Sequence, residues 1–114
     1  MVKQGDIILL DLSPHSGHEQ SGYRPALVVS NYFFNSLTNM TIVCPITNTG
    51  REFPLHVALD NRTTTTGVIL CEHIKSVDLS SRNYRIVDHM PDDLLNEVIN
   101  RVFAEIEKQL IQLA

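Results

Sequence analysis

The sequence has little cysteine, little net charge and no long apolar run. Its two cysteines, Cys44 and Cys71, lie far apart and outside any Cys-x-x-Cys pair, which argues against a disulfide or a metal pair and predicts buried free thiols. No apolar run approaches the roughly 20 residues that span a bilayer. The N-terminus lacks the apolar stretch of a signal peptide. We therefore expect a cytoplasmic protein with no membrane segment.

The net charge of −4 at pH 7 argues against a protein that binds nucleic acid by bulk electrostatic attraction. The negative charge is concentrated near the C-terminus. From Asp92 onward the chain has five acidic residues against two basic ones, which leaves residues 1–91 with a net charge of −1. A local cationic site is compatible with this distribution, although composition alone does not suggest RNA.

The length of 114 residues predicts one domain over residues 1–114, and a hydrophobic content of 43% is ordinary for a folded protein. Most of the chain reads as short β-rich runs separated by turn-rich segments. A short helical turn is predicted at 31–37. The predicted strands cover 7–12, 26–30, 41–46, 56–59, 67–71 and 74–78, with an additional short one at 83–87.

The last part of the sequence changes to a helical period. After Pro91, apolar residues recur at helical spacing from Leu94 to Leu110. Proline followed by Asp92 and Asp93 is a typical helix start, because the carboxylates meet the positive end of the helix dipole. The pattern predicts a mainly β protein with a C-terminal α-helix, built as a curled antiparallel sheet or small barrel.

The densest polar cluster lies at 14–25, which we interpret as a long loop between the first two strands. Loops of this length in compact domains are often functional, although composition alone favours a solvated hairpin with Gly17 and Gly22 supplying the turns. His15 and His18 have a spacing that can bind zinc on a helix. Here they lie in a glycine-containing loop without a third ligand, so no metal site is predicted.

The same loop contains side chains that can cleave RNA without a metal. That reaction needs a base for the 2′-OH proton, an acid for the leaving 5′-oxygen and a cation for the phosphorane. Glu19 or His18 can serve as the base, and Arg24 suits phosphate oxygens. The hydroxyls of Thr47 and Thr49 can add hydrogen bonds from a second loop.

Several other side chains have both a structural and a functional interpretation. Phe33, Phe34 and Phe53 can stack on bases, but core packing is expected for at least two of them. The four threonines at 63–66 predict a polar loop or strand edge. If residues 71–73 continue as extended chain between the strands at 67–71 and 74–78, alternation points the Glu72 side chain to the opposite face from Cys71 and His73. Glu72 would then face either a site or water.

A family resemblance extends along nearly the whole chain. Residues 17–30, GHEQSGYRPALVVS, resemble the signature loop and second strand of the MazF/PemK toxins. Further matching blocks follow in the family's order at Phe34-Asn35, Val43-Cys44-Pro45-Ile46-Thr47, Gly67-Val68-Ile69, Glu72 and Lys75-Ser76-Val77-Asp78.

The resemblance implies a type II toxin with a small SH3-like barrel of antiparallel strands and a C-terminal helix. Members of the family act as homodimers without a cofactor, and a cognate antitoxin blocks their RNA groove. They are sequence-selective, metal-independent endoribonucleases that leave a 2′,3′-cyclic phosphate and a 5′-OH on single-stranded RNA. The catalytic pair implied here is Arg24 and Thr47, with Glu19 in support. The candidate RNA contacts are Gln20, Ser21, Asn48, Thr49, Arg51, Glu72 and Lys75.

A histidine directly before the Glu-Gln pair, here His18, resembles the Kid/PemK-like branch of the family. The mechanism assigned to that branch uses this histidine with an Asp and an Arg near positions 70–72. In this sequence Leu70 stands at the Arg position and Glu72 replaces the Asp. The difference removes one participant of that mechanism and favours Arg24 with Thr47. His18 and Glu72 remain lesser candidates, and the choice between His18 and Glu19 as base stays open.

Two alternatives belong to other functional classes. A gyrase-poisoning toxin of the CcdB type depends on a C-terminal Trp-Gly-Ile, whereas this chain has no tryptophan and ends in Ile111-Gln112-Leu113-Ala114. A non-catalytic SH3-like binding module would use Arg24 and Thr47 only structurally, and it would leave RNA intact.

Overall fold

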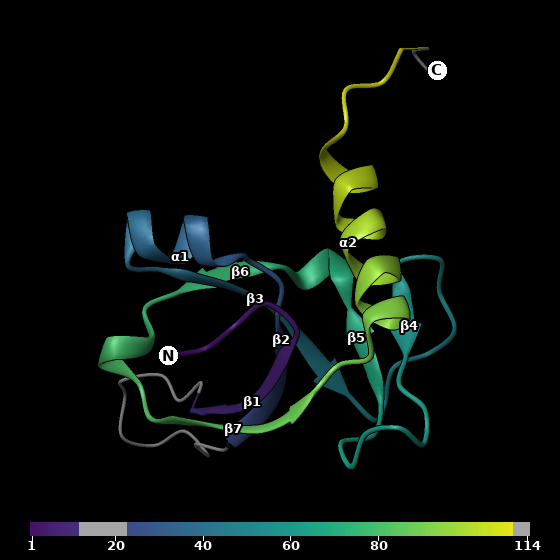
Figure 1. The fold of residues 1–114 in the computed structure, drawn as a ribbon. Helices are drawn as coiled ribbons and strands as arrows, with labels where there is room; N and C mark the ends of the chain where they lie inside the picture. The colour runs from purple at the N-terminus through teal and green to yellow at the C-terminus, as the bar shows by residue number, and fades with distance from the viewer. Residues whose placement is uncertain (12–22, 111–114) are drawn as a thin grey trace, which may run out of the picture.

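The computed structural model describes residues 1–11 and 23–110. One antiparallel sheet, two α-helices and two 3₁₀ turns make up this part of the chain (Figure 1). The strands are β1 (Asp6–Asp11), β2 (Tyr23–Val28), β3 (Thr41–Thr47), β4 (His56–Ala58), β5 (Val68–Leu70), β6 (Lys75–Val77) and β7 (Tyr84–His89). The helices are α1 (Tyr32–Thr38) and α2 (Asp92–Ile106), and the 3₁₀ turns are η1 (Cys71–His73) and η2 (Leu79–Ser81).

The strands follow the order β4-β5-β3-β2-β1-β7, with every pair antiparallel. β3 also pairs with β6. The first three residues of β3 pair with β6, and its last two residues pair with β5. The predicted class, mainly β with a C-terminal helix, is confirmed. The sheet is curved like a barrel, but it is not closed, because β4 and β7 stand at its two ends.

The core consists of two clusters separated by the central strands. Alternate residues of β1, β2 and β3 face α2, where Ile7, Leu27 and Cys44 are fully buried beside Val98. The intervening residues form a second cluster that includes Ile8, Leu10, Ala26, Val28 and Val43. Strand alternation therefore places apolar side chains on both faces of β1, as its continuous apolar run predicts. Cys44 and Cys71 are both buried and free, as predicted.

Helix α2 begins after Pro91 as predicted, but it ends at Ile106 rather than Leu110. Its first half packs on the sheet through Leu94 and Val98, whereas its last part projects away from the body (Figure 1). Leu110 is 97% exposed. Helical period alone does not sustain a helix where no tertiary surface lies beside it. No helix in the described part of the chain is long and apolar enough to cross a membrane.

The predicted turn at 31–37 is confirmed as α1. The Asn31 side chain caps it by accepting a 2.9 Å hydrogen bond from the Phe34 amide, and Asn39 ends it in the left-handed region at φ 57°. The expectation that at least two phenylalanines pack in the core was wrong. Phe33 on α1 is 71% exposed, and Phe53 in the segment between β3 and β4 is 37% exposed; neither belongs to a core cluster.

Two boundaries differ from the prediction in ways that affect the site. β2 begins at Tyr23, so Arg24 and Pro25 belong to a strand and not to the loop. Residues Cys71–His73 form η1 instead of continuing a strand, so alternation does not decide where Glu72 lies. Burial of Cys71 in the core beside α2 turns the chain out of the strand at this point. The threonine tract is a loop between β4 and β5, one of the two predicted possibilities.

Leu27→Ala should lower the free energy of unfolding by about 2–5 kcal/mol, because Leu27 is completely buried in a central strand and its truncation leaves a cavity. Leu110→Ala is the matched control, and its effect should stay within about 0.5 kcal/mol. Urea unfolding followed by circular dichroism measures both. Equal losses in the two variants would contradict the assigned core.

Candidate active site

The pairing of β2 with β3 brings Arg24 and Thr47 to one cleft. The ladder ends at Ala26↔Pro45, and Arg24 and Thr47 lie two residues beyond this pair on their respective strands. By alternation both belong to the same face of the sheet. They line a cleft of about 580 Å³ together with Pro25, Pro45, Ile46, Asn48 and Thr49.

Two prolines explain why the cleft opens at this point. Pro25 pairs only with Leu9 of β1, and Pro45 pairs only with Ala26 of β2. Proline has no backbone N–H and is tolerated in a strand where one side of the ladder is unpaired. The two prolines therefore end the β2–β3 ladder and leave room between the strands.

Hydrogen bonds link the two threonines of the cleft to each other. The Thr47 and Thr49 hydroxyl oxygens lie 2.9 Å apart, and the Thr49 amide donates to Thr47 Oγ1 at 3.2 Å. Arg24 is exposed and forms no ion pair with any residue in 1–11 or 23–110. An arginine placed beside hydroxyl groups is a suitable receptor for a phosphate group.

Two glycines allow the Thr47–Gly50 segment to pack closely against the start of β5. Gly67 has φ +121°, and a Cβ there would lie 2.6 Å from the carbonyl oxygen of Thr47. A Cβ on Gly50 would lie 2.2 Å from Val68 Cγ2. Both positions exclude a side chain, so the backbone beside Thr47 has little room to move.

Two of the predicted RNA contacts belong to a second cluster and not to the cleft. His56 lies between Arg51 and Glu72, with Nδ1 2.8 Å from the Arg51 carbonyl oxygen and Nε2 2.8 Å from Glu72 Oε2. The Arg51 guanidinium lies 5.2 Å from the centre of the Phe53 ring. His56 was not among the residues predicted from the sequence, because only its pairing with Leu70 brings it beside η1.

The contacts of His56 shift two pKa values in opposite directions. The pKa of His56 is raised, mainly by its hydrogen bond to the Arg51 carbonyl and further by Glu72, against the effect of burial. Burial is the largest single influence on Glu72 and acts to raise its pKa. The hydrogen bond and charge of His56 together with a backbone hydrogen bond outweigh it, so the pKa of Glu72 is lowered.

The other predicted site residues lie either away from the cleft or outside the described residues. Lys75 is exposed on β6 opposite Val43 and does not line the cleft. The predicted residues His18, Glu19, Gln20 and Ser21, together with His15, lie outside the described residues. Within 1–11 and 23–110, no three His, Cys, Asp or Glu side chains gather as metal ligands.

The chain matches the family model of the PemK-like, MazF-like toxin of type II toxin–antitoxin systems over residues 3–106. The protein therefore belongs to this family, which confirms the resemblance seen in its sequence. Endoribonuclease PemK of Escherichia coli is 35% identical over 105 residues, covering 89% of this chain and 79% of that protein. Endoribonuclease toxin ChpB of E. coli strain K12 is 36% identical over 113 residues, covering 92% and 94%.

Solved structures give the same result for the fold. A MazE–MazF crystal structure from Deinococcus radiodurans (Form-II) superposes with a TM-score of 0.86 at 32% identity, covering 95% of this chain and 97% of that one. The MazF crystal structure from the same organism (Form-I) gives a TM-score of 0.80 at 33% identity, covering 94% and 97%. The curved, open sheet with its C-terminal helix is thus the fold of MazF toxins.

The His56–Glu72 pair should stabilise the fold most strongly at mildly acidic pH. A raised His56 pKa contributes stability below the ordinary value of 6.5, and this is lost as pH rises through the folded-state pKa. A lowered Glu72 pKa contributes above the ordinary value of 4.5 and is lost as pH falls through the folded-state pKa. His56→Gln should therefore lower the unfolding midpoint more at pH 5.5 than at pH 8.5.

The exposed neighbour His73 provides the control for this prediction. His73→Gln removes the histidine next to Glu72, which acts on Glu72 through its charge alone and forms no hydrogen bond within the described residues, so its pH-dependent effect should be smaller. Thermal unfolding of the three proteins across the pH range measures the difference. A His56→Gln deficit that is constant with pH would show that the pair contributes packing and no charge.

Proposed function

We propose that the protein is the toxin of a type II toxin–antitoxin pair and cleaves single-stranded RNA without a metal. The observation that carries this proposal is the cleft between β2 and β3, which joins Arg24 to the hydroxyl groups of Thr47 and Thr49. Its family relatives PemK and ChpB are endoribonucleases by name. Cleavage occurs at selected sequences and leaves a 2′,3′-cyclic phosphate and a 5′-OH.

The proposed reaction is an internal transfer at phosphorus. The 2′-oxygen loses its proton to a base and attacks the phosphorus, while the bond to the 5′-oxygen breaks and that oxygen receives a proton. Arg24 binds the non-bridging oxygens, whose charge increases in the transition state, and the Thr47 hydroxyl donates a further hydrogen bond. Glu19 or His18 takes the 2′-OH proton; their assignment rests on the sequence.

RNA binding involves more than the reacting phosphate. We assign Asn48 and Thr49 to the bases next to the cleaved bond, since both line the cleft. Arg51, stacked on the exposed Phe53, adds a cation and an aromatic face for a further nucleotide. Glu72 supports Arg51 through His56. Lys75 is assigned to the phosphate backbone outside the cleft, and Gln20 and Ser21 to the adjoining loop.

The proposed partners are a cognate antitoxin and a second copy of the chain. The D. radiodurans structure with MazE supports an antitoxin that binds the toxin directly. A homodimer is supported by the exposed Phe103 and Ile106, 63% and 76% exposed, beside an apolar hollow of about 410 Å³ between α1 and α2. The protein acts in the cytoplasm, where its mRNA substrate is found.

Purified protein should cleave a long single-stranded RNA in the presence of excess EDTA, because Arg24 supplies the positive charge that a metal provides in other nucleases. Sequencing the 5′ ends of the fragments measures both the activity and the motif. A requirement for added Mg²⁺ would contradict the mechanism. Intact RNA in both buffers would favour a non-catalytic module, and trapped gyrase–DNA complexes would favour the gyrase-poisoning alternative.

Arg24→Ala should reduce the cleavage rate by at least about 10²-fold while the protein stays folded, because it removes a charge-stabilising donor. Arg101→Ala is the control, since Arg101 lies on α2 and bonds Pro54 and Glu97 outside the cleft. Single-turnover cleavage of a labelled oligonucleotide compares the two. Normal cutting by Arg24→Ala would show that the catalytic assignment is wrong.

A further inference from the structure

The loop at 59–67, between β4 and β5, is held by hydrogen bonds or ion pairs at three places, and the third is a residue that lines the cleft. The loop contains the four consecutive threonines at 63–66. The attachments are to α2, to β7 and to Asn48. The body of the protein therefore holds the loop in place as far as Thr66, the residue that contacts Asn48.

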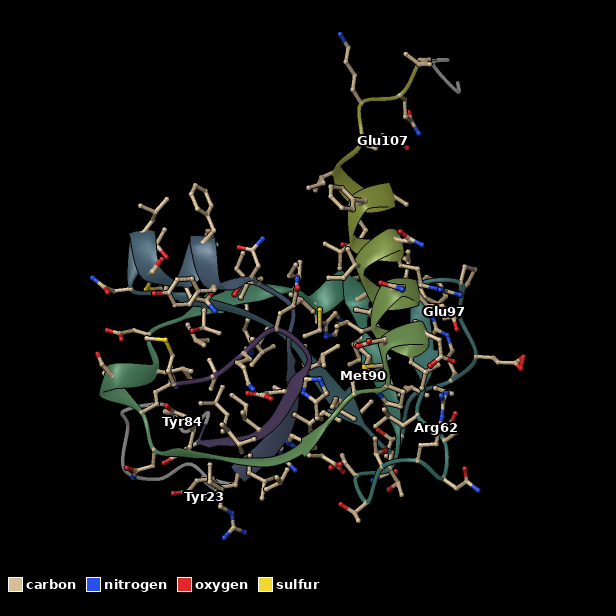
Figure 2. The ribbon with its side chains drawn as sticks, in the orientation of Figure 1. Tyr23, Arg62, Tyr84, Met90, Glu97 and Glu107 are labelled. Carbon is tan, nitrogen blue, oxygen red and sulfur yellow. The ribbon has the colours of Figure 1, made fainter. Side chains whose placement is uncertain are left out.

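The first attachment is an ion-pair network on the surface. Arg62 contacts Asp60 within the loop at 2.9 Å and Asp93 in the first turn of α2 at 2.8 Å. Figure 2 shows Arg62 below the start of α2. The three side chains are exposed, so this network orients the loop more than it stabilises the fold.

The second attachment is stronger, because one carboxylate oxygen accepts three hydrogen bonds. Asp88 Oδ2 on β7 lies 2.8 Å from the Thr64 amide, 2.9 Å from the Thr64 hydroxyl and 3.0 Å from the Thr65 amide. The pKa of Asp88 is lowered, because these bonds outweigh the opposing effect of burial. β7 pairs with β1, so the middle of the loop is tied to the opposite end of the sheet.

The third attachment reaches the cleft itself. The Thr66 hydroxyl donates to Asn48 Oδ1 at 2.9 Å. Asn48 Oδ1 also lies 3.2 Å from the place that a Cβ of Gly67 would occupy, beside the carbonyl oxygen of Thr47. The oxygen end of the Asn48 amide is therefore held against the loop. Its nitrogen makes no hydrogen bond with the described residues.

We propose that Thr66 is a positioning residue for substrate selectivity, and that it fixes Asn48 so that the Asn48 amide nitrogen donates to an acceptor atom on one substrate base. An asparagine side chain has an acceptor end and a donor end, and a hydrogen bond that occupies one end fixes which end faces a ligand. Thr66 occupies the acceptor end, which leaves two N–H donors. This inference rests on the proposed ribonuclease function and adds the determinant of one motif position.

Thr66→Val tests the inference, because valine has a similar shape but no hydroxyl. The expected result is a loss of selectivity at a single position of the cleavage motif, by about tenfold in the ratio of preferred to other bases. The rate at the preferred sequence should change much less. Thr66→Ser retains the hydroxyl and should retain the wild-type motif. Asp88→Ala should relax the same position, because it frees the middle of the loop.

Thr65→Val is the matched control, since Thr65 is the adjacent residue of the same loop and its hydroxyl makes no hydrogen bond with the described residues. Fragment 5′ ends from one mixed RNA pool are compared for all variants. If valine prevents folding, Thr66→Ala replaces it. Wild-type protein that leaves RNA intact would overturn the proposed function. Selective wild-type cleavage with an unchanged motif in Thr66→Val would overturn only the role of Thr66.

Discussion

The antiparallel pairing of β2 with β3 decides the arrangement of the rest of the molecule. Its register, with Leu27 opposite Cys44, sets which side chains enter the cluster beneath α2 and which enter the opposite cluster. The same register places Arg24 and Thr47 on one face beyond the end of the ladder. A slip of one residue would exchange the faces and bury polar groups, so core packing and site geometry depend on one set of backbone hydrogen bonds.

β3 has a second role because it is shared between two partners. β6 pairs with its first half and β5 with its last two residues. The cleft segment that follows Thr47 is thus held from the side of β5, where Gly67 allows backbone to approach backbone. The cleft gains rigidity from neighbours that are distant in sequence, as the proposed stabilisation of developing charge by fixed groups requires.

The net negative charge of the protein does not prevent a local cationic site. The chain carries −4 overall, yet Arg24 stands exposed in the cleft. Glu72 and Asp88 already have partners away from the cleft: Glu72 bonds His56, and Asp88 accepts bonds from the threonine loop. Neither carboxylate lines the cleft that contains Arg24. A weakly acidic protein can therefore present a cationic site to a phosphate group.

The sequence by itself determined the fold class, the approximate positions of the strands, the start of α2 at Pro91 and the choice of Arg24 and Thr47 as candidates, because period, proline placement and family motif are local properties of the chain. Only the tertiary structure decided where α2 ends, that Glu72 lies beside His56, and that the threonine loop reaches Asn48. These features depend on contacts between segments separated by many residues. The energy of such contacts comes from burial and hydrogen bonding across strands, which no short stretch of sequence encodes.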